Sequence, residues 1–333
     1  MRTHDVAIIG GSLAGASCAV GLKSLGLDVV TFDRDSFPRR KVCGELLSPG
    51  AIRCLKLIGV HEEVTRAGAV QIESLRLKAR SYRFDIPFPE PALGFSRERL
   101  DVLLASKAGV EHGCKVEGVR KVSDGFVLTV LNPAGDPFEV FSRIILDAAG
   151  RLSRFTRMVP SAQYGVQYHR AGEKSSILDF EFFEGGYGGV VSVEGRRRNF
   201  CFLVDREHVQ RFRRGHECTV TGRIAYERAE GPYLSIGDSG GMVDPFCGEG
   251  MRNALESGLL SAEKVGEGLR KGHTYNVIRD QYDAAYTGRW RKKRAITAAL
   301  RTALGSRSLS VGLFALGSSR PKLASLVLRK LWS

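Results

Sequence analysis

Two glycine-rich segments could bring backbone N–H groups close to an anionic cofactor. In the first, Gly10 and Gly15 flank a small residue, Ser12, directly after a short apolar run. Gly10 permits a tight turn, Gly15 lets the next helix pack closely, and the Ser12 position normally lets backbone approach a pyrophosphate. Helix N-termini favour such anions. We therefore predict a pyrophosphate site at the start of the helix, on Ser12, Leu13, Ala14 and Gly15.

An acidic residue stands where such a site holds a ribose. Residues 5–9 and 27–32 have the pattern of buried strands, with a helical pattern over 14–25 between them. Asp33 follows the second strand, where a carboxylate accepts hydrogen bonds from ribose hydroxyls and disfavours a 2′-phosphate. We expect Asp33 and its neighbour Arg34 to belong to a dinucleotide site that does not take NADP.

The second glycine-rich segment, residues 233–258, has two interpretations. Its Gly-Asp-Ser-Gly-Gly stretch matches the nucleophile segment of trypsin-like serine proteases, with Ser239 as the nucleophile. That interpretation needs an upstream His and Asp on an all-β fold, whereas this chain opens with a βαβ pattern. The longer string Gly-Asp-x-x-Gly-x-x-Asp-Pro-x-x-Gly-Glu-Gly, over residues 237–250, instead resembles the second flavin-binding motif of the para-hydroxybenzoate hydroxylase and geranylgeranyl reductase superfamily.

This resemblance implies FAD as the cofactor. Asp238 would accept a ribitol hydroxyl, and Pro245 would pass beside the isoalloxazine. The helix after Gly248 would direct its N-terminus at the N1–C2=O edge, where a helix dipole stabilises the negative charge of reduced flavin. Gly250 and Met251 would belong to the same part of the site.

A basic segment after Asp33 resembles the geranylgeranyl reductase branch, whose members carry Lys-x-Cys-Gly close to the flavin. Here the segment is Lys41, Cys43 and Gly44. Arg40 and Lys41 would neutralise the pyrophosphate, and this positive charge would lower the pKa of the Cys43 thiol; a small packing residue is the other interpretation of Cys43. Arg97 lies in a segment that resembles the family's Arg-x-x-Leu-Asp helix start, whose Arg lies by the flavin phosphates.

The middle of the chain carries the weaker part of the resemblance. Tyr187 matches the tyrosine of a Gly-Gly-Tyr-x-Trp-x-Phe-Pro segment that lines the substrate cavity of geranylgeranyl reductases, but Gly189 replaces the Trp. We therefore expect a more open cavity wall. Residues 147–150 resemble an Asp-Ala-Thr-Gly variant of reductase and halogenase relatives. Through the resemblance, Cys43, Tyr187 and Pro245 are the candidate catalytic residues.

The formal net charge of +14 is concentrated in basic clusters at residues 39–41, 196–198, 211–214 and 289–294. Such clusters fit solvated faces, an anionic cofactor or an anionic membrane surface, and no recognition module favours nucleic acid. The 7 cysteines and 7 histidines are scattered without Cys-x-x-Cys or His-Glu-x-x-His spacing. We therefore predict neither a metal site nor a disulfide framework.

The C-terminal region combines a basic cluster with an apolar face and ends near Trp332. A basic amphipathic helix with Trp can lie on a membrane surface, although such a helix more often closes a domain. No apolar run reaches the length of a membrane span, and the N-terminus enters a strand pattern without a signal peptide. We expect a cytoplasmic protein with potential peripheral contact, through residues 289–333, to the inner membrane face.

These patterns and the resemblance together predict an α/β fold. It would combine a glutathione-reductase-type, Rossmann-like FAD-binding domain with an inserted mixed β-sheet substrate lobe and a C-terminal helical segment. The expected division is 1–70, 95–160 and 230–272 for the FAD-binding domain, 71–94 and 161–229 for the substrate lobe, and 273–333 for the C-terminal region.

The resemblance implies an FAD-dependent oxidoreductase that reduces a C=C bond of a lipophilic, isoprenoid or polyketide-like substrate with hydride from flavin N5. The alternatives are a monooxygenase that forms a C4a-hydroperoxide and a non-catalytic protein that binds flavin or lipid. No second dinucleotide motif is present, so NAD(P)H would bind transiently or a ferredoxin would supply the electrons. The sequence does not identify the proton donor.

Overall fold

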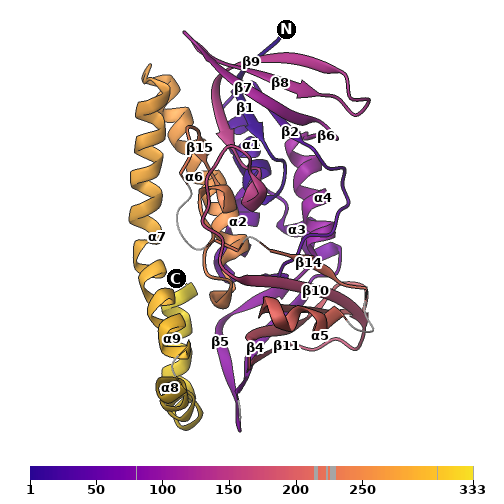
Figure 1. Ribbon diagram of the computed structural model, residues 1–333, viewed down its shortest axis with the longest axis vertical. Helices are drawn as coiled ribbons and strands as arrows, with labels where there is room; N and C mark the ends of the chain where they lie inside the picture. Colours follow the sequence, from indigo (N-terminus) through magenta and orange to yellow (C-terminus); the bar gives the residue numbers. More distant parts are fainter. Residues whose placement is uncertain (80, 214–216, 223, 226–229, 306, 333) are drawn as a thin grey trace.

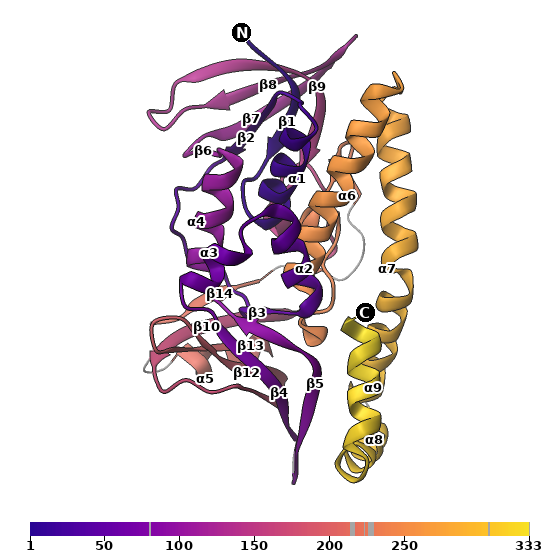
Figure 2. The same ribbon diagram turned by 180° about the vertical axis from the view of Figure 1, so that it is seen from behind.

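The structure is a computed structural model that describes residues 1–333 apart from 80, 214–216, 223, 226–229, 306 and 333. One β-sheet lies at each end of the long axis, and helices lie between and beside the sheets (Figures 1 and 2). The long helix α7 (Tyr275–Gly305) runs along one side of the molecule. The α/β class predicted from the sequence, with a Rossmann-like domain, a second mixed sheet and C-terminal helices, is confirmed.

The first sheet forms the dinucleotide-type core. Its strands are β1 (Arg2–Ile9), β2 (Val29–Asp33), β6 (Glu111–His112), β7 (Lys115–Val122), β8 (Gly125–Leu131), β9 (Pro137–Asp147) and β15 (Leu234–Ser235). Their order is β6-β2-β1-β9-β8-β7, with β15 beside β9. The pairs β2–β1, β1–β9 and β9–β15 are parallel, and Ile9, Asp147 and Ser235 are in register. The loops that follow these three residues therefore leave the sheet at the same edge.

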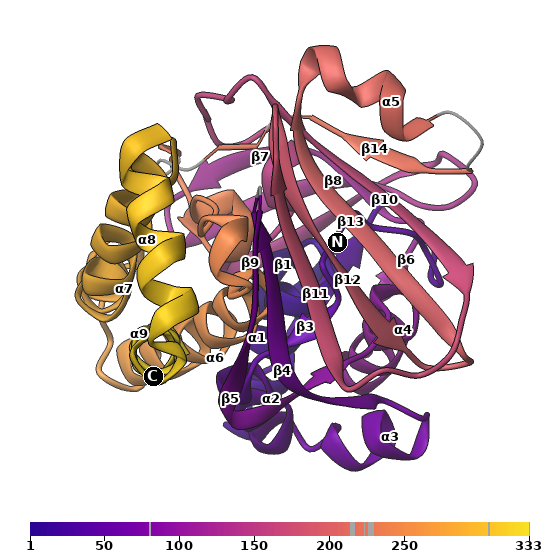
Figure 3. The ribbon, with the colours of Figure 1, turned by 90° about the horizontal axis from the view of Figure 1, so that it is seen from below.

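The second sheet is mostly antiparallel and forms the other end of the molecule (Figure 3). Its order is β14-β10-β13-β12-β11-β4-β5-β3, with β4 and β11 parallel. The strands are β3 (Leu46–Leu47), β4 (Val70–Ala79), β5 (Tyr82–Gly94), β10 (Gln163–Ala171), β11 (Ile177–Phe183), β12 (Gly186–Val193), β13 (Arg197–Asp205) and β14 (Thr219–Thr221).

The other helices follow the predicted pattern with shifted ends. They are α1 (Leu13–Ser24), α2 (Pro49–Ile58), α3 (His61–Arg66), α4 (Arg97–Ala108), α5 (Val209–Arg213), α6 (Gly250–Arg270), α8 (Arg307–Ser319) and α9 (Pro321–Trp332). Gly59 takes the left-handed conformation, with φ of 77°, and ends α2 before α3 begins. Ser96 caps α4, because its hydroxyl accepts a hydrogen bond from the Arg99 N–H.

Small residues let α1 and α6 pack against each other at very short range. A Cβ on Gly258 would lie 2.1 Å from Ser17 Oγ and 2.4 Å from the Ala14 carbonyl oxygen. One turn further along, a Cβ on Gly21 would lie 2.7 Å from Ala262 Cβ. Since α1 follows β1 and α6 follows β15, this contact brings the N-termini of both helices to the same edge of the first sheet.

The C-terminal helices α8 and α9 pack against β5 of the second sheet. Trp332 is 4% exposed and packs on Phe88 of β5, with ring centroids 4.4 Å apart. Trp332 is therefore part of the core and is not placed to anchor the chain at a membrane interface, which corrects that interpretation of this residue. Within the part of the chain that the structure describes, no helix has the length and apolar character that crossing a bilayer requires. Peripheral contact through residues 289–333 stays a prediction.

The α1–α6 contact can be tested by adding one methyl group. We expect Gly258→Ala to lower the free energy of unfolding by about 1–3 kcal/mol, because backbone at Ala14 leaves no room for a Cβ. Gly288→Ala in α7 is the matched control, since nothing lies within 4 Å of its added Cβ. Removing a helical glycine there should stabilise the protein by up to about 1 kcal/mol. Denaturant unfolding measures both values; equal stability of the two variants would contradict the contact.

Candidate functional site

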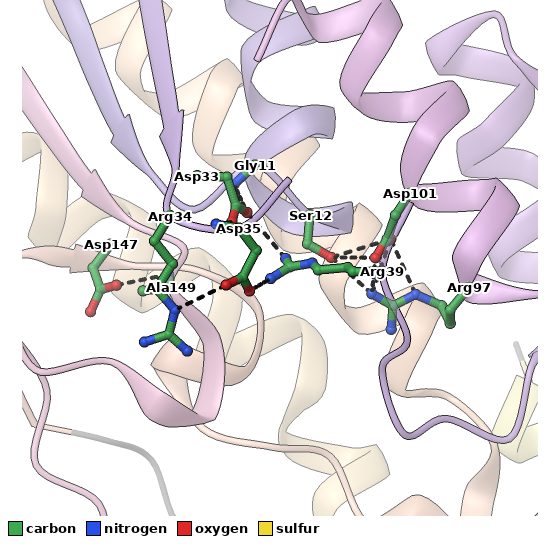
Figure 4. Close-up of polar contacts among 10 residues, drawn as sticks. All are labelled: Gly11, Ser12, Asp33, Arg34, Asp35, Arg39, Arg97, Asp101, Asp147 and Ala149. Carbon is green, nitrogen blue, oxygen red and sulfur yellow. Dashed lines mark hydrogen bonds and ion pairs between the residues drawn. The ribbon is translucent and has the colours of Figure 1, made fainter. Parts of the chain in front are cut away.

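The first turn of α1 is open to a ligand. Ser12 is the N-cap residue, but its side chain makes no capping hydrogen bond to the helix. Its hydroxyl instead donates to the Asp101 carboxylate and accepts from Arg97 Nη2 at 2.8 Å (Figure 4). The N–H groups of the first turn are thus left to bind an anion, and Ser12, Leu13 and Ala14 line a cavity.

The two predicted glycines hold this turn in place. Gly10 has a φ of 103°, a conformation that favours glycine, and a Cβ there would lie 2.3 Å from the Ala148 carbonyl oxygen. A Cβ on Gly15 would lie 1.8 Å from the Gly10 carbonyl oxygen. Both positions therefore require glycine, and Gly15 allows the close packing of helix on strand that its spacing predicts.

Asp33 is 3% exposed, and its carboxylate is held by three donors. It accepts hydrogen bonds from the backbone N–H groups of Gly11 at 2.8 Å and Asp35 at 3.0 Å, and from Arg39 Nη2 at 3.1 Å (Figure 4). Arg39 was missed as a site residue, although it stands in the basic cluster 39–41. The side chain of Arg34 is 52% exposed and lies 3.8 Å from Asp35, so it turns away from Asp33.

A buried ion pair supports the first turn of α1 from the side. Arg97 and Asp101 are 5% and 0% exposed, and Arg97 Nη2 lies 3.0 Å from Asp101. Burial opposes the charge of Arg97, but Asp101 and Cys43 outweigh it and raise the pKa of the guanidinium. Arg97 lines the cavity beside Ser12, as the expected phosphate role requires. Asp101 was missed, although its i,i+4 spacing from Arg97 predicts the pair.

The segment from Arg40 to Gly44 is divided between two environments. Lys41, Cys43 and Gly44 line the main cavity, whereas Arg40 is 57% exposed and pairs with Glu217 at 3.0 Å outside it. Burial, aided by Arg97, lowers the pKa of Lys41. Burial also raises the pKa of the Cys43 thiol although Arg97 opposes the shift, so the expected lowered pKa is wrong. Desolvation outweighs the neighbouring positive charge.

The second glycine-rich segment meets the same cavity from the opposite side. Asp238 lies in the turn after β15 and lines the cavity, and no described residue hydrogen-bonds to its carboxylate. Pro245, Gly248, Gly250 and Met251 line the cavity next to it. The α6 helix begins at Gly250 with no capping side chain, so its first N–H groups also remain open to a ligand.

The protease interpretation of this segment is excluded by the position of Ser239. The side chain is fully buried, and its hydroxyl donates to the carbonyl oxygens of Asp147 at 2.7 Å and Ile236 at 2.8 Å. A serine held in this way ties the turn to β9 and is not accessible to a substrate.

The other end of the cavity is apolar and aromatic. The ring of Tyr187 lies among those of Phe180, Phe182 and Phe246, with centroids 5.6–6.1 Å from its own. The Tyr187 hydroxyl donates to Asp244 at 3.4 Å. Side chains of β4, β5, α8 and α9 complete this end, and they include Leu75, Leu77, Phe84, Ile86, Leu313, Leu316, Leu323 and Leu328. The whole cavity has a volume of about 450 Å³.

The residues at the polar end fit FAD. The first turn of α1, with Arg97 and Lys41 beside it, can bind a pyrophosphate. The free carboxylate of Asp238 can accept hydrogen bonds from hydroxyl groups of the ribitol chain, and the open N-terminus of α6 can stabilise negative charge on the flavin. Cys43 and Pro245 line the same cavity, but the pKa of the Cys43 thiol is raised by desolvation and not lowered as expected.

Asp238 is the direct test of this fit. We expect Asp238→Asn to weaken FAD binding by about tenfold to a hundredfold, because a hydrogen bond to a charged group contributes about 1.5–3 kcal/mol. Asp280→Asn is the control, since Asp280 is 69% exposed and lies on α7. Titration of the apoprotein with FAD, followed by flavin fluorescence, measures both affinities. Unchanged affinity in Asp238→Asn would remove this residue from the site.

Asp147, at the end of β9, provides a test by pH. Burial raises the pKa of Asp147 to about 6, although Ser153 and the Ala149 N–H hydrogen-bond to its carboxylate. This value lies above the unfolded pKa of about 3.9, so the folded protein favours the protonated Asp147 carboxyl. The contribution of Asp147 to the free energy of unfolding is therefore complete below about pH 4 and is lost as the pH rises through about 6. We expect the stability of the wild type relative to Asp147→Asn to fall by roughly 3 kcal/mol over that range. Denaturant unfolding at several pH values checks this; a difference that does not vary with pH would contradict it.

Comparisons with known proteins agree with the geometry. A family model described as "FAD binding domain" matches residues 3–124. A 1H-pyrrole-2-carbonyl-[peptidyl-carrier protein] brominase of Pseudoalteromonas luteoviolacea is 30% identical over 192 residues, which are 55% of this chain and 46% of that protein. This chain thus spans about half of that relative. A menaquinone reductase of Mycolicibacterium smegmatis is 28% identical over 316 residues, covering 79% of this chain and 76% of the relative.

A solved structure shows the same fold over the whole chain. A geranylgeranyl bacteriochlorophyll reductase-like protein from Thermoplasma acidophilum superposes with a TM-score of 0.82 at 16% identity, covering 99% of this chain and 96% of the other. The family match covers β1, α1 and Asp33 of the site, and the solved structure shows that the overall fold is shared. The chain carries an FAD-binding domain over residues 3–124 and is similar to FAD-dependent oxidoreductases that include reductases, halogenases and monooxygenases.

Proposed function

We propose that this oxidoreductase reduces a C=C bond in the chain of an isoprenoid lipid. The observation that carries the proposal is the continuous cavity, which begins among the FAD-binding residues and ends between β4–β5 and α8–α9. FAD, when bound and reduced, supplies a hydride to the substrate. Apolar side chains at the far end, such as Leu77 and Leu328, would hold an extended hydrocarbon and exclude water from the polar end.

Two reductases among the curated relatives support the reductive reaction. The menaquinone reductase and a digeranylgeranylglycerophospholipid reductase of Methanothermobacter thermautotrophicus match 79% and 80% of this chain. A squalene monooxygenase of Mus musculus matches 50% of it. NAD(P)H or a ferredoxin as electron donor is part of this proposal.

A single-turnover experiment tests the reaction. The purified protein with FAD is photoreduced without O2 and mixed with a menaquinone or a geranylgeranyl lipid in detergent. We expect reoxidation of the flavin together with a product that carries two more hydrogens, read by mass spectrometry. Reoxidation that requires O2 and adds oxygen to the lipid would instead support the monooxygenase alternative and overturn the proposal.

The same assay tests where the hydrocarbon lies. We expect Leu77→Trp, which fills part of the apolar end, to raise KM for a long isoprenoid chain about tenfold, with a much smaller effect on a one-isoprene analogue. The matched control is Leu57→Trp, because Leu57 is 78% exposed and lines no part of the cavity. Equal effects on long and short substrates would place the chain elsewhere.

A further inference from the structure

A second cavity lies beside the main one and has a different character. It has a volume of about 250 Å³ and a polar lining, and it shares Lys41 and Glu45 with the main cavity. The charged groups that line it with Glu45 are Arg40, Lys41, Glu98, Arg170, Arg197 and Glu217. The wall formed by Lys41 and Glu45 therefore separates a polar space from the space where the lipid would be reduced.

Glu45 is held in this wall in an unusual conformation. It is 2% exposed, and its φ of 56° lies in the left-handed region, which non-glycine residues rarely adopt. Its carboxylate accepts hydrogen bonds from the Arg97 N–H at 3.0 Å, and its carbonyl oxygen accepts from the Phe95 N–H at 3.1 Å. Backbone strain of this kind persists where the surrounding structure enforces it, and it is frequent at functional sites.

His169 of β10 connects Glu45 to the second cavity. His169 Nε2 lies 2.7 Å from Glu45 Oε2, and the side chain of His169 is 20% exposed and lines the second cavity. The two residues are 124 positions apart in the chain, so the fold brings them together. A continuous line of proton-carrying groups thus runs from the polar cavity through His169 and Glu45 to the wall of the main cavity.

We propose that Glu45 and His169 carry the proton that reduction of the C=C bond consumes. This inference rests on the proposed function. As the hydride that reduced FAD would supply forms a C–H bond at one alkene carbon, the π bond of the C=C breaks. The Glu45 O–H bond breaks with it, and its proton forms a C–H bond at the other carbon. The Glu45 carboxylate regains a proton from the His169 imidazolium, and the imidazole regains one from water in the second cavity. Glu45 is the catalytic residue in this scheme, and His169 acts through it.

The contact itself is tested without turnover. His169→Ala opens space beside Glu45, and we expect the oxidised protein to bind imidazole there, measured by calorimetry. In His169→Ala with Glu45→Gln, the charge-assisted hydrogen bond is lost, so imidazole should bind at least tenfold more weakly. Equal imidazole affinity in the two proteins would show that the second cavity does not present Glu45 to a proton carrier, and would overturn the proposal.

The role in catalysis is tested in the anaerobic single turnover. Glu45→Gln keeps an acceptor for the Arg97 N–H but has no acidic proton, so lipid reduction should slow by about a hundredfold to ten-thousandfold, with FAD affinity unchanged. His169→Ala should also be slow, and added imidazole should restore the rate, which a merely structural role of His169 does not explain. Glu207→Gln and His208→Ala are matched controls, because this pair, 3.7 Å apart, lines neither cavity.

The outcomes separate the two proposals. A wild-type protein that does not reduce the lipid anaerobically refutes the proposed function, whatever the imidazole titration gives. A wild-type protein that reduces the lipid, with Glu45→Gln within threefold of its rate, refutes the proton route alone. If Glu45→Gln does not fold, the failure of imidazole to restore His169→Ala refutes it equally.

Discussion

The close packing of α1 on α6 is the constraint on which the rest of the site depends. Gly258 leaves room for Ser17 and for the Ala14 carbonyl group, so the two helix axes approach where larger residues would separate them. Both helices begin at the edge of the first sheet where the parallel strands end. Their uncapped first turns therefore face a single cavity, and one extended dinucleotide can use both.

The C-terminal helices then fix the loop that completes the cavity. Arg301 of α7 lies 3.2 Å from Asp244, Lys293 of α7 lies 2.9 Å from Glu249, and the Trp332 indole donates to the Cys247 carbonyl oxygen at 3.3 Å. The loop between Asp238 and α6 is thus held on one side by the first sheet and on the other by α7 and α9. The same helices supply the apolar wall opposite β4 and β5. The closure of the apolar end of the cavity and the shape of its polar end are consequently linked.

Short sequence patterns predicted much of the candidate site. The turn at Gly10 and Gly15, the acid at Asp33 and the motif around Asp238 depend on short spacings. The structure places both glycines and Asp33 around the first turn of α1, and Asp238 in the wall of the cavity. Contacts between distant segments could not be predicted in the same way. Nothing near Glu45 in the sequence indicates His169. The expected lowering of the Cys43 pKa was wrong because desolvation of the thiol depends on packing that the neighbouring sequence does not reveal. The position of Trp332 in the core also depends on packing against β5.

The central claim is that one cavity holds FAD at its polar end and an isoprenoid chain at its apolar end. A crystal structure of the oxidised protein with FAD and a menaquinone tests it most directly. The account predicts the pyrophosphate within hydrogen-bond distance of the Leu13 and Ala14 N–H groups, and the hydrocarbon between β4–β5 and α8–α9. A lipid bound outside this cavity, or a pyrophosphate away from the start of α1, would contradict it.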